Sequence, residues 1–165
     1  MRDLLEQIKK GLDANLFFLA LFTALTIPDI CGALSSDNGE ASGQKYQDWF
    51  DQYVSKKYNN FFNGQNCYYF RCSLLHQGTS QHNKSNYSRI LFVEPSVINL
   101  IAHNNIMNDA LNIDIKIFCK DIIAGAEEYL AENEETELYK INYDKFVHRY
   151  PNGLSPYIIG VPVFS

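Results

Sequence analysis

The sequence predicts a mainly α-helical protein: a bundle of four to five helices with a small β-hairpin inserted before the last long helix. Apolar residues recur at helical spacing through the first 78 positions and again over 114–132, and short β-prone runs lie between these parts. With 165 residues, 46% of them apolar, the chain suits one domain with its own core. We expect a single domain over 1–165, and its parts are a core bundle (2–78), a β-hairpin insertion (89–113), a long helix (114–132) and an apolar tail (138–165).

The first half of the chain predicts a series of helices. Residues 2–10 form a short amphipathic helix, and residues 14–26 are apolar nearly all round, which is typical of the central helix of a bundle. Pro28 is expected to end that helix and to start a short one over 28–34. After a polar loop over 35–43, a further helix is expected over 44–57.

The stretch NCYYFRCSLLHQG, from Asn66 to Gly78, predicts the helix that carries the chemistry. Asn66 can cap its start, and Gly78 supplies the left-handed residue that ends it. At about 100° per residue the helix has an inward arc and an outward face. The inward arc contains Cys67, Tyr68, Phe70, Leu74 and Leu75, and the outward face contains Tyr69, Ser73, His76 and Gln77.

The second half predicts two or three strands, one long helix and the tail. A polar loop over 79–88 carries His82 and Lys84, and strands at 89–94 and 97–102 flank a Pro-Ser turn as a hairpin. A third strand is expected at 110–113. Asp114 then caps an amphipathic helix to about residue 131. The tail is apolar and punctuated by Pro and Gly, so we expect it to pack on the body or on another subunit.

Charge is distributed unevenly along the chain. The formal net charge of −5 argues against an electrostatic grip on nucleic acid over the whole surface. The window 52–93, however, has no Asp or Glu and holds five cations among nine aromatic residues and ten amides. Cations, aromatic rings and amides are what a surface for single-stranded nucleic acid needs. The same composition also fits a helix pair whose aromatic residues are core, and both interpretations stay open.

Cysteine usage and hydropathy indicate a cytoplasmic protein. None of the four cysteines forms a CxxC pair, which is typical of buried thiols in a reducing compartment: Cys31, Cys67, Cys72 and Cys119. The apolar run Leu16–Ile27 is too short to span a bilayer and lacks a basic lead, so we expect no targeting segment and no membrane partner. A fourth ligand to join Cys67, Cys72 and His76 is not evident, so we expect neither a metal nor a cofactor.

Arg71 is the most informative residue of the motif helix because it falls within the apolar arc. A permanently charged guanidinium there must find an acid, carbonyl groups or a phosphate to offset its desolvation. Asp29 is the acid nearest a buried run and the first candidate for a structural partner. Alternatively, Asp29 only complements the dipole of its own helix start.

The element Arg71-Cys72-Ser73-Leu74-Leu75-His76 is an R-x4-H motif on a late helix of a small bundle, and it resembles the HEPN superfamily. The resemblance covers residues 2–78 loosely and the motif closely. It implies that Arg71 and His76 are the catalytic pair of a metal-independent endoribonuclease of a toxin or defence system. It also implies a homodimer that brings two motifs together, and an antitoxin or other protein partner.

The chemistry of RNA supports the same assignment. RNA carries its own nucleophile, the 2′-hydroxyl, so cleavage needs a group that transfers protons near neutral pH and a cation for the charge on the phosphorane. A spacing of five turns a helix by about 140°, so we expect Arg71 and His76 of one chain to lie on different faces. A two-fold homodimer with this helix near its axis would unite them.

Five residues around the motif are the expected substrate-binding residues: Tyr69, Ser73, Gln77, His82 and Lys84. Two other functions remain open. One is a non-catalytic binding module for RNA, a nucleotide or a partner protein, and the other is a structural dimerising subunit that uses the tail. In the purely structural interpretation Arg71 pairs with Asp29 or Glu94, and His76 caps the end of its helix.

Overall fold

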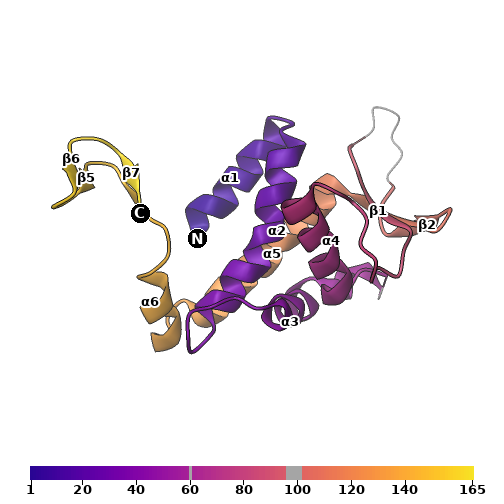
Figure 1. Cartoon of the computed structure of the whole chain (residues 1–165), viewed down its shortest axis with the longest axis horizontal. Helices are drawn as coiled ribbons and strands as arrows, with labels where there is room; N and C mark the ends of the chain where they lie inside the picture. Colours follow the sequence, from indigo (N-terminus) through magenta and orange to yellow (C-terminus); the bar gives the residue numbers. More distant parts are fainter. Residues whose placement is uncertain (60, 96–101) are drawn as a thin grey trace.

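The computed structural model describes residues 1–59, 61–95 and 102–165, and it is mainly α-helical as the sequence predicts (Figure 1). Helices account for most of the regular structure, and the sheets are small. The described residues form six α-helices: α1 (Arg2–Asp13), α2 (Phe17–Leu34), α3 (Gly43–Tyr53), α4 (Gly64–Gln77), α5 (Ile115–Asn133) and α6 (Glu137–Tyr143). A 3-10 turn, η1 (Ser55–Tyr58), follows α3.

Helix α2 is the centre of the bundle, where it packs against α1, α3 and α5 (Figure 1). The predicted break at Pro28 is wrong, because α2 runs on through this residue to Leu34. Proline removes one helical hydrogen bond, the one that residue 28 would donate to the carbonyl of Ala24. Pro28 is buried, and packing of α2 on several sides supports the helix more than one lost bond weakens it.

Among the described residues, α2 is also the one helix that is long and apolar enough to cross a membrane, judged by length and composition alone. Its mean hydropathy is 1.9, and half of its residues are buried inside the body. Helices α1, α3 and α5 pack against α2 and cover part of its apolar surface within the chain.

The strands after α4 form a mixed three-stranded sheet in the order β1-β3-β2. Strand β1 (Arg89–Val93) lies parallel to β3 (Ala110–Asp114), and β2 (Asn105–Met107) lies antiparallel to β3. The predicted strand 97–102 lies outside the described residues except for residue 102, so the expected hairpin partner of β1 is not described. The hairpin that is present joins β2 to β3 through Asn108 and Asp109, whose φ angles of 50° and 61° fit a type I′ turn.

The C-terminal part begins with α5, whose start is capped as predicted. The Asp114 carboxylate accepts a hydrogen bond from the Ile117 N–H at 2.9 Å. The predicted tail over 138–165 is partly helical, because the Thr136 hydroxyl caps α6 and Tyr139 and Asn142 bury one face of it. Two small antiparallel sheets follow α6. Strand β4 (Arg149–Tyr150) pairs with β7 (Val163–Phe164), and β5 (Gly153–Leu154) pairs with β6 (Ile158–Ile159).

The start of α4 lies directly against α3. Asn63, not Asn66, is the N-cap, because its side-chain oxygen accepts from the Asn66 N–H at 2.9 Å. The Gly64 N–H donates to the Asp51 carboxylate at 2.7 Å. A Cβ at position 64 would collide with the backbone of Gln47, so only glycine allows this approach of the two helices.

We expect Gly64→Ala to lower the free energy of unfolding by about 1–3 kcal/mol, because the added methyl group forces α4 away from α3. Urea denaturation measures the loss. The matched control is Gln65→Ala, one position along on the exposed face, for which we expect a change within about 0.5 kcal/mol. Equal stabilities of the two variants would contradict the close approach.

Candidate active site on helix α4

Helix α4 is fixed in the bundle by its contacts with α3 and α2. Cys67 and Phe70 are buried, and the Cys67 thiol lies 3.3 Å from the Tyr46 hydroxyl of α3. The helix ends at Gly78, which has the expected left-handed conformation (φ 66°). The end of α4 that carries the R-x4-H motif is therefore held at a defined position beside α2.

Arg71 pairs with Asp29 across the contact between α4 and α2. The guanidinium Nη2 lies 2.5 Å from Asp29 Oδ2, and less than a fifth of each side chain is exposed. This is the internal partner that the sequence suggested for Arg71, rather than Glu94. The charge that looked misplaced on the apolar arc of α4 thus faces a carboxylate from the central helix.

His76 also contacts Arg71 within the same chain. The guanidinium Nη1 lies 2.8 Å from His76 Nε2, so the expectation that these side chains lie on different faces is wrong. The helical wheel places Cα–Cβ directions only, whereas the long side chain of Arg71 reaches around the end of the helix. His76 itself is exposed to solvent. One chain therefore assembles an imidazole, a guanidinium and a carboxylate.

The contact selects one tautomer of the neutral imidazole. A guanidinium only donates hydrogen bonds, so His76 Nε2 accepts, and the proton of the neutral ring resides on Nδ1. Nη1 of the same guanidinium also lies 3.9 Å from the Cys72 thiol, a neighbour that the sequence did not mark as part of the site. The lone pair of His76 is thus occupied by Arg71 when no substrate is bound.

Burial and charge act in opposite directions on the ion pair. Burial raises the pKa of Asp29 from its ordinary value, and the neighbouring Arg71 lowers it only in part. Burial alone would lower the pKa of Arg71, but Asp29 and Cys72 outweigh that effect and raise it. The buried Arg71 Nε has no hydrogen-bond partner among the described residues. The guanidinium is therefore held mainly by charge, and an anion with better geometry can compete for it.

Three of the predicted substrate-binding residues lie together. The rings of Tyr69 and His82 are stacked, with centroids 4.5 Å apart and planes 2° apart, and Lys84 Nζ lies 6.0 Å from the centre of the Tyr69 ring. The Lys84 backbone N–H donates to His82 Nδ1 at 3.1 Å, which fixes the loop after α4. An exposed cation and two half-exposed rings therefore share one surface.

The other two predicted substrate-binding residues lie differently. Gln77 is exposed at the end of α4 as expected. Ser73 was expected on the outward face but is fully buried, and its hydroxyl has no hydrogen-bond partner among the described residues. Its burial removes it from any surface that binds substrate. The bundle covers a wider arc of α4 than the apolar residues indicated.

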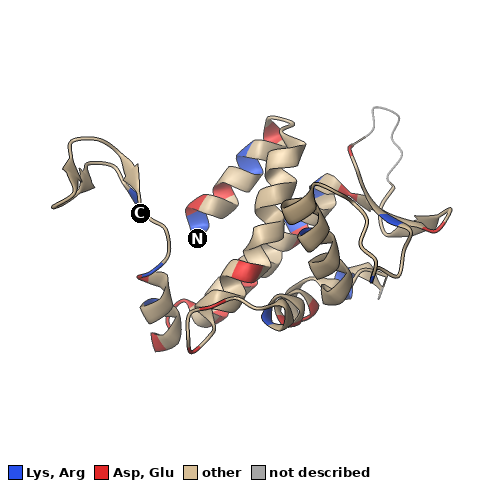
Figure 2. Cartoon of the chain, in the orientation of Figure 1, with Lys and Arg blue, Asp and Glu red and all other residues tan. Residues whose placement is uncertain are grey.

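The acid-free window is less basic in space than in sequence (Figure 2). Two cations of the window pair with acids from other helices. Asp29 of α2 pairs with Arg71, and Asp121 of α5 lies 2.9 Å from Lys57. Most aromatic residues of the window are core residues or pack against the core, which is the simpler of the two interpretations of this composition. Two aromatic residues of the window lie outside this packed set, Tyr69 and the partly exposed Phe61, and of these Tyr69 lies on α4 with the motif.

No group of three His, Cys, Asp or Glu side chains within residues 1–59, 61–95 and 102–165 has the arrangement of a metal site. Burial raises the pKa of the Cys31 and Cys67 thiols well above the ordinary value. Burial raises the pKa of Cys119 to about 12. These three thiols are therefore uncharged at neutral pH and are poor metal ligands.

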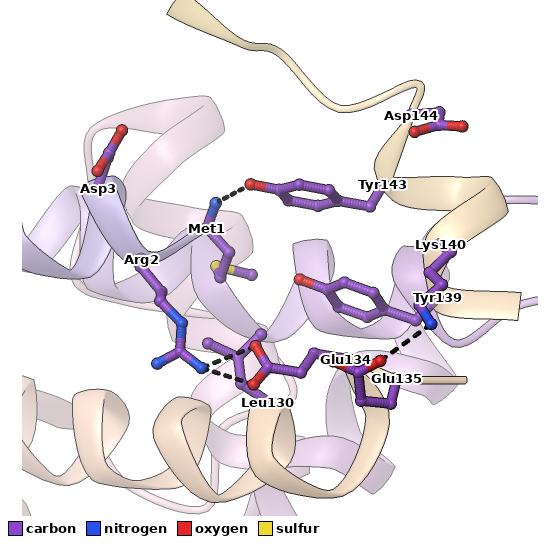
Figure 3. Close-up of a pocket in the computed structure, with 10 residues that line it drawn as sticks. All are labelled: Met1, Arg2, Asp3, Leu130, Glu134, Glu135, Tyr139, Lys140, Tyr143 and Asp144. Carbon is purple, nitrogen blue, oxygen red and sulfur yellow. Dashed lines mark hydrogen bonds and ion pairs between the residues drawn. The ribbon is translucent and has the colours of Figure 1, made fainter. Parts of the chain in front are cut away.

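A pocket of about 340 Å³ lies away from the motif, between the start of α1 and helix α6 (Figure 3). Four of its charged side chains form two pairs: Arg2 donates to both oxygens of Glu134 at 2.8 and 2.7 Å, and Lys140 pairs with Glu135 at 3.0 Å. Tyr139 and Tyr143 stack along one wall. Its two cationic side chains, Arg2 and Lys140, are paired with carboxylates, and none of the described residues that line it is a histidine, so this pocket is a weaker candidate for proton transfer than the Arg71 site.

No family model, curated protein or solved structure matches this chain. The functional assignment therefore depends on the geometry around Arg71 and on the resemblance of its motif.

We expect the Asp29–Arg71 pair to contribute a coupling energy of about 1–3 kcal/mol, because either charge left alone at this depth has lost most of its solvation. A double-mutant cycle of Asp29→Ala and Arg71→Ala, followed by urea unfolding, measures it. The matched control is the exposed pair Lys9 and Glu127, 2.9 Å apart, for which we expect less than about 0.5 kcal/mol. Similar coupling in both pairs would contradict a structural role for Asp29.

Proposed function

We propose that Arg71 and His76 form the active site of a HEPN-like, metal-independent endoribonuclease that cuts single-stranded RNA. The observation that carries the proposal is the 2.8 Å contact between the guanidinium and an exposed imidazole. A toxin or defence role in the cytoplasm, with an antitoxin or similar protein as regulator, follows from the resemblance of the motif and belongs to the same proposal.

The mechanism assigns one task to each side chain. His76 takes the proton of the 2′-hydroxyl, whose oxygen attacks the adjacent phosphorus. The bond from phosphorus to the 5′-oxygen breaks, and that oxygen takes a proton from solvent water, so the products are a 2′,3′-cyclic phosphate and a 5′-hydroxyl. Arg71 stabilises the negative charge that gathers on the phosphorane. The arriving phosphate draws the guanidinium away from His76 Nε2, which frees the lone pair that the base needs.

Asp29 is a positioning residue in this mechanism. It touches neither the 2′-hydroxyl nor the phosphorus in our proposal, and it acts through Arg71, which it holds at the end of α4. It also competes with the phosphate for the guanidinium. Burial raises the pKa of Asp29, and the neighbouring Arg71 lowers it only in part, so the carboxylate depends on Arg71 to stay charged.

The stack of Tyr69, His82 and Lys84 supports a surface for a single strand beside the catalytic pair. Tyr69 and His76 are seven positions apart on α4, so they share a face and lie about 10 Å apart along the axis. Aromatic rings stack on bases of any sequence, and a lysine neutralises phosphate. We propose that this surface binds the nucleotides next to the cleaved bond, with Gln77 available for hydrogen bonds to a base edge.

We propose that the protein is a homodimer, although the pairing of Arg71 with His76 does not require one. One chain already brings Arg71 and His76 together, so subunit pairing is not needed to complete the pair. Exposed apolar side chains on α2 and in the tail support association of two copies. Two motifs near a two-fold axis would then present two such sites to one RNA strand.

A non-catalytic binding module is the second candidate function, and one observation favours it. Arg71 is tied to Asp29, and the lone pair of His76 is occupied by Arg71. A site that keeps this arrangement in the presence of RNA binds the strand without cutting it. The third candidate, a structural dimerising subunit, depends on the exposed tail alone.

We expect purified protein to cleave labelled single-stranded RNA in the presence of EDTA, with a cyclic phosphate at the new 3′ end. Arg71→Ala and His76→Ala should each lower the cleavage rate by about 10²–10⁴-fold, because each removes charge stabilisation or proton transfer from the transition state. Gel analysis of the products measures both effects.

The control variants for this assay are Arg89→Ala and His148→Ala, which remove the same side-chain types elsewhere. We expect them to cleave at the wild-type rate. Binding of RNA without cleavage by the wild-type protein would reject the nuclease and support the binding module. The absence of both binding and cleavage would leave the structural subunit.

We expect Tyr69→Leu and His82→Ala to weaken binding of a non-cleavable 2′-deoxy oligonucleotide by about tenfold each, because one stacked base contributes roughly 1–3 kcal/mol. Fluorescence anisotropy of the labelled strand measures the affinity. The matched control is Phe61→Leu, a partly exposed aromatic residue of the same window. If this control weakens binding as much as the other two, the proposed surface is wrong.

A further inference from the structure

Two exposed apolar surfaces of this chain are not used by the proposed active site. The first is on the α2 start and is here called the α2 patch: Leu16, Phe18, Leu19 and Phe22. The second is on the C-terminal arm, residues 147–165, and its exposed apolar side chains are Val147, Tyr157, Ile158, Ile159, Val161 and Phe164. Contiguous apolar surfaces of this kind often mark the places where a protein contacts another molecule.

The C-terminal arm extends away from the helical body instead of packing on it (Figure 1). Its short strands pair with one another, and the backbone of His148 exchanges hydrogen bonds with Ser165 at 2.8 and 3.1 Å. The exposed fraction is 83% for Tyr157 and 76% for Ile159. The arm is therefore an ordered ribbon that is ready to contact another molecule without first folding.

The α2 patch is ordered in the same way and lies between two grooves. The rings of Phe18 and Phe22 contact each other edge to face, with centroids 6.0 Å apart, and 72% of Phe18 is exposed. A groove of about 460 Å³ along α1 is lined by Leu16 and Leu19, and one of about 220 Å³ beside β1 is lined by Phe18. Grooves of this size accept apolar side chains of the kind that the arm presents.

We propose that the C-terminal arm of one chain packs on the α2 patch of a second copy, and that two copies exchange arms around a two-fold axis. The chain carries both unpartnered surfaces, so a second copy supplies each with a partner of matching apolar chemistry. The α2 patch exposes on the order of 400 Å² of apolar area, and two arm contacts that cover it bury roughly 1,600 Å² in total, the size of a stable interface. Arm exchange of this type is a low-cost route to a dimer.

Charge is consistent with a second copy as the occupant. The arm, residues 147–165, contains Arg149 and no acid, whereas the whole chain carries −5. The arm of one copy therefore meets a body of opposite net charge, which favours the encounter between copies. This inference does not depend on whether Arg71 and His76 cut RNA.

The test uses full-length variants and measures molar mass by analytical ultracentrifugation. Ile159→Asp damages only the arm, and Phe18→Asp damages only the α2 patch, so we expect the wild type to be a dimer and each variant to be a monomer. An equimolar mixture of the two variants retains one intact arm and one intact patch that fit each other. We expect this mixture to regain heterodimers, with at least a tenfold higher affinity than either variant alone.

Each alternative predicts a different result. Contact of arm with arm would leave Phe18→Asp dimeric on its own, and contact of patch with patch would leave Ile159→Asp dimeric, so either result overturns the proposal. A mixture that stays monomeric, or a wild type that is monomeric at every concentration tested, overturns it as well. A monomeric wild type that binds anionic lipid vesicles through Phe18 identifies a membrane surface instead. Ile141→Asp, an exposed apolar position on α6 outside both surfaces, is the control and should remain a dimer. Equal unfolding midpoints in urea establish that the variants are folded.

Discussion

The guanidinium of Arg71 is the group on which the arrangement of this protein depends. It joins the central helix α2, through Asp29, to the exposed His76 at the end of α4. A guanidinium that is less than a fifth exposed has lost much of its hydration. The carboxylate of Asp29 and the ring nitrogen of His76 replace part of the lost water contacts. The same interaction therefore helps to hold α4 on α2 and places a charged group beside an imidazole that solvent can reach. Structure and proposed chemistry share this one residue.

The bundle positions that group through constraints on both helices. On one side, Gly64 lets the start of α4 approach the backbone of α3, and Asn63 caps the helix there. On the other side, α2 continues past Pro28, so that Asp29 lies within an unbroken helix at the level of Arg71. If α2 ended where the proline suggested, Asp29 would belong to a separate helix start and would serve its dipole instead. The continuity of α2 thus decides the partner of Arg71.

Local signals in the sequence predicted much of this fold. The caps at Asp114 and Gly78 depend on side-chain chemistry and backbone conformation within a few residues, and both were found where the sequence placed them. Interactions distant in sequence were harder to predict. The parallel pairing of β1 with β3 has no signature in the residues of either strand, so the sequence did not predict it. The burial of Ser73 depends on how far neighbouring helices wrap around α4. Helical spacing likewise separated Arg71 from His76, because it does not account for the reach of a long side chain.

The central claim is that Arg71 donates to His76 within a single chain, and the most direct measurement is the ¹⁵N NMR spectrum of the His76 ring at neutral pH. The account predicts that the neutral form of the ring carries its proton on Nδ1 and accepts at Nε2, and that this tautomer preference is lost in Arg71→Ala. A ring protonated on Nε2, or a spectrum unchanged by Arg71→Ala, would contradict it.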